Sequence, residues 1–125
     1  MLLSILGEVY LLSRSIDDVK ELPYWVKKVL KEFAKRVHDV LGDAEIYLFG
    51  SYARGDWLVD SDIDLVVISP KFEGLDFGKR YSLLRKLLPK DRGFEILAYT
   101  PREFEYVKKK SIVIQDAMEY WIRVV

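Results

Sequence analysis

The chain has 125 residues, half of them hydrophobic, and its 20 basic and 20 acidic side chains give a formal net charge of zero. This length and composition fit one globular domain, residues 1–125, and exclude an intrinsically disordered chain. The balanced charge disfavours a protein whose main role is to grip nucleic acid through its overall electrostatic field. Because the chain contains no cysteine, disulfides and thiolate metal sites are excluded.

Residues 1–22 form an N-terminal extension, and the spacing of its apolar residues predicts an amphipathic helix over residues 2–12. The apolar run is interrupted by Glu8, lacks a basic leading region and is too short to span a bilayer. We therefore expect no membrane segment, no signal peptide and a cytoplasmic location. The apolar surface of this extension makes a homo-oligomer a reasonable hypothesis.

The segment from Pro23 to Leu41 predicts the longest helix of the chain. Its apolar residues recur every three or four positions, its lysines fall on the remaining faces, and Gly42 follows as a natural end. The lysine-rich face is either a solvated surface or a contact for RNA or an acidic partner. The next two apolar segments, residues 45–50 and 62–69, are short and rich in β-branched side chains, which predicts strands.

Strands and helices continue to alternate in the second half of the chain. Asp76 is expected to cap a helix that stops at Pro89, and residues 93–100 predict a third strand. Thr100-Pro101-Arg102-Glu103 is typical of a capping box, so a helix should follow. The tail, residues 111–125, predicts a short helix and then an extended stretch. This order indicates an α/β or α+β fold, a small mixed β-sheet with helices packed mainly on one face.

Two carboxylates interrupt the second predicted strand. Asp62 and Asp64 are two residues apart, so in a strand they point to the same face, about 6 to 7 Å from each other along the chain. Carboxylates this close repel each other unless a cation lies between them. Oxygen ligands of this kind suit Mg²⁺ or Mn²⁺.

Glu95 interrupts the third predicted strand in a similar way. If this strand lies beside the Asp62–Asp64 strand, Glu95 joins the two aspartates. Three carboxylates can hold two cations about 3.5 to 4 Å apart, the arrangement used for in-line phosphoryl transfer. The alternative interpretation is a charged residue on an exposed strand face.

A Gly-Ser pair lies between the first two predicted strands. Gly50 permits unusual dihedral angles and a close backbone approach. Ser51 would begin a short helix, whose free N–H groups can hold phosphates. Arg54 is either a phosphate contact or a solvated residue of that helix. Trp57, in the following loop, is either a packing residue or a cover for a nucleotide.

The stretch FGSYARGDWLVDSDIDLVV, residues 49–67, resembles the signature of the DNA polymerase β-like nucleotidyltransferase superfamily. Gly50-Ser51 is followed by ten residues and then Asp62-Ile63-Asp64. The stretch is most similar to the minimal nucleotidyltransferase (MNT) members, which share the positions of Arg54, Gly55 and Ser61. The resemblance extends over roughly residues 24–120 and leaves residues 1–22 outside.

The resemblance implies a role for each matching residue. Nucleotide binding falls to Gly50, Ser51, Arg54 and Ser61. Catalysis and the binding of two Mg²⁺ ions fall to Asp62, Asp64 and Glu95. The third carboxylate would also assist deprotonation of the attacking hydroxyl, although many family members have Asp at that position.

The resemblance further implies a Mg²⁺-dependent enzyme that moves a nucleoside monophosphate, AMP from ATP, onto a hydroxyl of a protein or RNA partner. Small MNT chains are often encoded beside a helical HEPN-type ribonuclease and act as its antitoxin, so we expect such a partner. Two alternatives stay open. One is an antitoxin that binds nucleotide without turnover and acts by binding its partner, and the other is an enzyme that modifies a small molecule.

Overall fold

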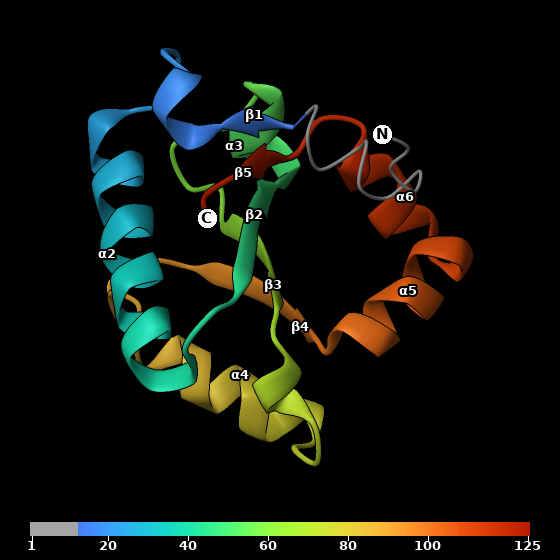
Figure 1. Cartoon of the computed structure of the whole chain (residues 1–125). Helices are drawn as coiled ribbons and strands as arrows, with labels where there is room; N and C mark the ends of the chain where they lie inside the picture. Colours follow the sequence, from blue (N-terminus) through green and yellow to red (C-terminus); the bar gives the residue numbers. More distant parts are fainter. Residues whose placement is uncertain (1–12) are drawn as a thin grey trace.

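The computed structural model describes residues 13–125. The predicted helix over residues 2–12, and the self-association inferred from it, lie outside the described residues. The described residues form a mixed sheet with the strand order β1-β5-β2-β3-β4 (Figure 1). Its strands are β1 (Arg14–Ser15), β2 (Glu45–Phe49), β3 (Ile63–Ile68), β4 (Phe94–Tyr99) and β5 (Ile122–Arg123). The three strands predicted from the sequence are confirmed, each to within one residue at either end.

The predicted helices are also present. They are α2 (Tyr24–Leu41), α3 (Gly50–Arg54), α4 (Phe77–Arg85), α5 (Pro101–Lys110) and α6 (Ile112–Met118), with 3-10 turns η1 (Ile16–Asp18) and η2 (Pro70–Phe72). The Asp76 side chain caps α4 as predicted, by accepting a hydrogen bond from the Lys79 N–H at 2.8 Å. The regular helix ends at Arg85, before Pro89, and the Arg85 guanidinium donates to the Pro89 carbonyl at 2.8 Å. Among the described residues, no helix has the length and apolarity needed to cross a membrane.

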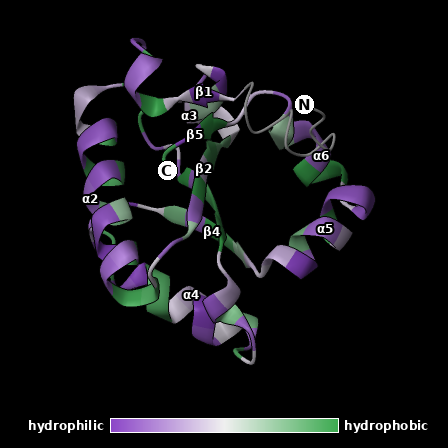
Figure 2. Ribbon diagram, viewed as in Figure 1, coloured by the Kyte–Doolittle hydropathy of each residue, from purple (hydrophilic) through white to green (hydrophobic). Residues whose placement is uncertain are grey.

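The sheet has helices on both faces. On β3, Ile63, Leu65 and Val67 pack in one cluster with the buried stripe of α2 and with Leu84 of α4. Val66 and Ile68 face the other way and pack against side chains of α5, α6 and the following turn, among them Phe104, Ile114 and Trp121. In Figure 2 much of β2 and β4 is hydrophobic, whereas much of the surface of α2 is hydrophilic.

The predicted mixed α/β class is confirmed, but one detail of it needs correction. The expectation that helices pack mainly on one face does not describe α5 and α6, which cover part of the second face. The physical reason is that β3 is apolar at successive positions, so that burying only one of its faces would leave Val66 and Ile68 in water.

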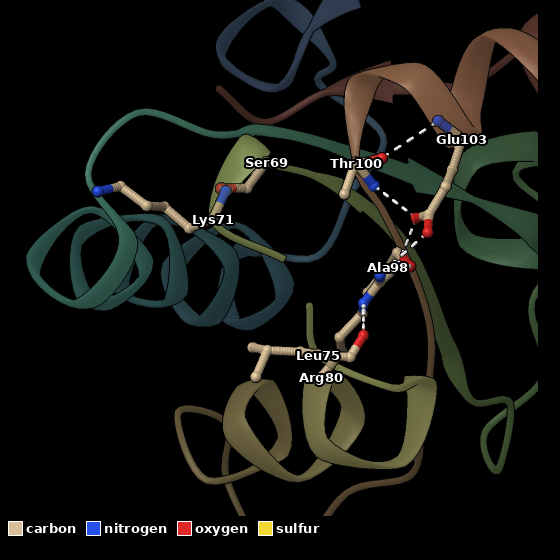
Figure 3. Close-up of polar contacts among 7 residues, drawn as sticks. All are labelled: Ser69, Lys71, Leu75, Arg80, Ala98, Thr100 and Glu103. Carbon is tan, nitrogen blue, oxygen red and sulfur yellow. Dashed lines mark hydrogen bonds and ion pairs between the residues drawn. The ribbon is translucent and has the colours of Figure 1, made fainter. Parts of the chain in front are cut away.

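A buried arginine joins α4 to the start of α5 (Figure 3). Arg80 is only 3% exposed, and its guanidinium makes two hydrogen bonds to the Glu103 carboxylate, at 2.5 and 3.0 Å. It also donates to the backbone carbonyls of Leu75 and Ala98, at 2.8 and 3.1 Å. Glu103 is in turn the third helical residue of the predicted capping box with Thr100. The Arg80 contact holds the pKa of Glu103 below its ordinary value.

We predict that Glu103→Ala lowers the free energy of unfolding by about 3 kcal/mol, because the buried Arg80 charge loses its counter-ion. Glu103→Gln should cost less, since its amide oxygen can still accept from the Thr100 N–H. Glu105→Ala, which removes a partly exposed ion pair with Lys108 on the same helix, should cost less than about 1 kcal/mol. Urea unfolding followed by tryptophan fluorescence measures all three, and equal costs for Glu103→Ala and Glu105→Ala would contradict the role of the buried pair.

Candidate active site

The strand register brings the predicted carboxylates together. β2 and β3 are antiparallel with Phe49 opposite Asp64, and β3 and β4 are parallel with Asp64 opposite Glu95. Asp64 therefore lies between Glu95 and the point where β2 ends and Gly50 begins α3. The expectation that the Glu95 strand lies beside the strand of Asp64 is confirmed.

One cleft of about 560 Å³ collects every residue that the sequence singled out for the site. Those residues are Gly50, Ser51, Arg54, Ser61, Asp62, Asp64 and Glu95. Sequence reasoning missed the rest of the lining, which is Phe49, Ile112, Val113, Asp116 and Tyr120. The available signal was the four-residue spacing of Ile112, Asp116 and Tyr120, which places side chains on one helical face.

Two glycines leave the space that the aspartates occupy. A Cβ atom at Gly50 would lie 1.8 Å from Oδ2 of Asp64, and a Cβ atom at Gly93 would lie 2.0 Å from Oδ1 of Asp62. Gly50 also has a positive φ of 73°, a backbone conformation that residues with a side chain rarely adopt. The backbone of each glycine thus packs closely against one carboxylate, and sequence reasoning did not identify the position of Gly93 beside Asp62.

The carboxylates give the cleft an excess of negative charge. Asp64 is half-buried, and its pKa rises to about 6, first because burial disfavours the ionised form and then because of the neighbouring charges of Glu95 and Asp62. Arg54 acts in the opposite direction but does not offset them. A group of hard oxygen donors that disfavours its own ionisation is chemically suited to a divalent cation.

The fit to a cation rests on this donor chemistry and on the room left by the glycines. Over residues 13–125, no three His, Asp or Glu side chains have the arrangement that encloses a metal ion. All three carboxylates line the cleft. Asp62 and Glu95 are exposed, and Asp64 is half-buried.

Arg54 and Ser61 line the cleft, and each also has a partner within the protein. Nη1 of Arg54 donates to the Tyr120 hydroxyl at 3.1 Å, and Nε donates to Asp56 at 3.3 Å. Oγ of Ser61 accepts from the Leu58 N–H at 2.7 Å, which closes the loop before Asp62. Neither residue is simply solvated, so each helps to shape the cleft it lines.

Trp57 has a packing role. Its ring stacks on Tyr52 at 5.3 Å and packs against the cluster beneath α2, and within the described chain it is not part of the cleft lining. The interpretation of Trp57 as a cover for a nucleotide is therefore not supported by its position.

Comparison with known proteins identifies the family of the chain. The sequence pattern of the nucleotidyltransferase domain family matches residues 26–120, about three quarters of the chain. The chain belongs to this nucleotidyltransferase family. The match includes every cleft residue identified above, from Phe49 to Tyr120.

Relatives of this nucleotidyltransferase have named activities. It is 33% identical over 86 residues to a "putative protein adenylyltransferase" of Methanocaldococcus jannaschii, covering 67% of this chain and 85% of the relative. It is also 33% identical over 84 residues to the poly(A) RNA polymerase cid12 of Schizosaccharomyces pombe, covering 67% of this chain. The match spans only a quarter of that polymerase's length.

A solved structure of similar fold comes from Sulfolobus solfataricus and is described as a "putative nucleotidyltransferase". The TM-score is 0.54 at 26% identity, over 66% of this chain and 73% of the other. The two chains thus have a similar fold over about two thirds of this chain.

We predict that Asp64→Asn stabilises the protein at pH 7.5 in the presence of a chelator. The folded-state pKa, about 6, lies above the ordinary 3.8, so ionising Asp64 costs folding free energy. That cost is absent well below pH 3.8, grows between the two pKa values and is complete above pH 6. The stabilisation should therefore disappear in acid. Thermal unfolding across this pH range measures it, with the exposed α2 residue in Asp39→Asn as control, and a gain that persists in acid would contradict the assignment.

We predict that Gly50→Ala lowers the free energy of unfolding more than Gly55→Ala does. Both glycines have positive φ, so both substitutions share the backbone strain of about 1 to 2 kcal/mol. A Cβ at Gly55 meets no atom within 4 Å, whereas at Gly50 it displaces the Asp64 carboxylate. Urea unfolding compares the pair, and equal losses would show that the contact between Gly50 and Asp64 contributes nothing.

Proposed function

We propose that the protein transfers a nucleoside monophosphate, AMP from ATP, onto a hydroxyl of a macromolecular partner with the help of Mg²⁺. The observation that carries the proposal is the strand register at Asp64. It brings the Gly50-Ser51 turn and the carboxylates of two adjacent strands into one cleft of a nucleotidyltransferase domain.

In this proposal, different residues of the cleft bind the phosphates and the metal ions. Gly50 and Ser51 bind the β- and γ-phosphates, with Arg54 and Ser61 beside them. Asp62, Asp64 and Glu95 hold two Mg²⁺ ions, or Mn²⁺, which when bound would neutralise phosphate charge and orient the α-phosphate.

The proposed reaction is a displacement at the α-phosphate. The acceptor hydroxyl oxygen forms a bond to phosphorus, the bond between the α-phosphorus and the bridging oxygen breaks, and pyrophosphate leaves. Glu95 is at the exposed side of the cleft, where it can accept the hydroxyl proton. In-line attack of this kind needs little more from the protein than positioning and charge stabilisation.

The acceptor we favour is a protein. Support comes from the relatives of Methanocaldococcus jannaschii that are named as protein adenylyltransferases and that this chain covers over most of their length. A helical HEPN-type ribonuclease, inactivated by AMP transfer, is the partner we propose, with this protein as the antitoxin. An RNA hydroxyl is the second candidate acceptor, supported by the similarity to a poly(A) RNA polymerase.

We predict that Asp62→Asn and Asp64→Asn each lower Mg²⁺-dependent transfer of AMP by roughly 100-fold or more, because each removes charge that the cations require. The measurement uses ATP labelled at the α-phosphate, Mg²⁺ and the product of the neighbouring gene. Asp60→Asn is the matched control, since Asp60 is an exposed aspartate of the same loop and does not line the cleft within the described chain.

Two outcomes would contradict this assignment. Unchanged transfer in either Asp62→Asn or Asp64→Asn would show that the carboxylates do not hold the cations. Tight binding of the partner that is unaffected by Asp64→Asn, with no transfer of label in the wild type, would favour an antitoxin that acts by binding.

A further inference from the structure

The helix α6 has two faces with different surroundings. Ile114 and Ala117 are fully buried against the sheet. Ile112, Val113 and Asp116, together with Tyr120 in the following turn, line the cleft instead, and we call these four residues the α6 wall. The buried residues are three positions apart, and cleft residues recur four positions apart. This spacing is expected of a helix that lies between a core and a cavity.

The α6 wall is attached to the phosphate side of the cleft. The Tyr120 hydroxyl accepts the hydrogen bond from Arg54, and the guanidinium lies 5.6 Å from the centre of the Tyr120 ring. Behind the wall, Trp121 is buried and stacks on Tyr47 of β2 at 3.9 Å. The wall is therefore held between the core and α3, in a fixed position relative to Gly50 and Ser51.

The chemistry of the wall is unlike that of the carboxylate side. Ile112 is 81% exposed and Val113 is 59% exposed, so two adjacent apolar side chains face the cleft. The Asp116 carboxylate makes no hydrogen bond or ion pair within residues 13–125. A carboxylate without a cation repels phosphate but accepts hydrogen bonds from neutral hydroxyl groups.

We propose that the α6 wall binds the nucleoside half of the nucleoside triphosphate, with Ile112 and Val113 against the face of the base and Asp116 accepting hydrogen bonds from ribose hydroxyls. This inference rests on the function proposed above. In that proposal, the triphosphate lies along the Gly50-Ser51 turn and the carboxylates. The nucleoside is then the uncharged part that needs an apolar surface and a hydrogen-bond acceptor in the same cleft.

The wall would also act on specificity. An apolar contact to the face of a base is tolerant of base identity, whereas a carboxylate that binds sugar hydroxyls discriminates a ribonucleotide from its deoxy analogues. In this proposal, Ile112 and Val113 pack against the face of the base, and Asp116 distinguishes ribose from deoxyribose.

The test compares Mg²⁺-dependent binding of ATP, 2′-deoxy-ATP, 3′-deoxy-ATP and inorganic tripolyphosphate by calorimetry. Asp116→Ala should weaken ATP binding roughly 10-fold, the size expected for a hydrogen bond to a charged group. It should not weaken the binding of tripolyphosphate, because the lost carboxylate repels phosphate, and it should reduce the preference for ATP over at least one deoxy analogue. Ile112→Ser should weaken all three nucleotides several-fold and again leave tripolyphosphate unchanged.

Two variants serve as controls for the wall. Glu119→Ala removes another exposed carboxylate just after α6, and Val40→Ser removes an exposed apolar side chain of α2; neither lines the cleft in the described chain. Both should bind ATP as the wild type does. All four substitutions are at exposed positions, and unchanged thermal unfolding would show that the fold is retained.

The remaining outcomes would contradict either the inference about the α6 wall or the proposed function. If Asp116→Ala weakens tripolyphosphate as much as ATP, Asp116 acts on the phosphates or their cations, and the inference is wrong. If both wall variants bind ATP like the wild type, the nucleoside lies elsewhere. If the wild type binds neither ATP nor tripolyphosphate with Mg²⁺, the proposed function itself fails.

Discussion

The position of β3 between β2 and β4 is the constraint on which the site depends. Its side chains alternate, so Ile63, Leu65 and Val67 enter the cluster beneath α2, whereas Asp64 points to the same face as Val66 and Ile68. On that second face α5 and α6 cover the apolar end of the strand and leave Asp64 half-buried at the cleft. The same alternation that builds the core therefore aims a carboxylate at the place where the helical cover ends. The charged cleft is a continuation of the second face of the sheet.

Local patterns predicted most of the fold and half of the cleft. The three-and-four spacing of α2, the Asp76 cap and the Thr100 capping box are decided by near neighbours, and all of them are present. The two-residue spacing of the aspartates predicted that both face the same way, and both line the cleft, although Asp62 comes just before β3. The pairing of β3 with β4 then brings Glu95 beside Asp64. What the residues do chemically is still a proposal, because the fold fixes where the carboxylates lie and not which ligand they bind.

The features that sequence reasoning missed depend on residues far apart in the chain. No local pattern singles out Arg80, and its pairing with Glu103 makes its burial tolerable. The pairing of Arg54 with Tyr120 joins positions 66 residues apart. The apolar residues of α6 occur on both of its faces, so the sequence does not tell which face packs on the sheet and which one lines the cleft. The sequence therefore did not predict that α5 and α6 cover the second face of the sheet.

The link between Arg54 and Tyr120 has a consequence for how the domain responds to its ligand. The cleft is built from α3, near the middle of the chain, and from α6 and the turn after it, and the hydrogen bond from Arg54 to Tyr120 joins the two segments. A molecule bound there would contact both segments in the folded domain and lose these contacts when the domain unfolds. Its binding energy would therefore raise the free energy of unfolding and the midpoint of the transition. A bound ligand would therefore connect, through non-covalent contacts, two segments that lie far apart in the sequence.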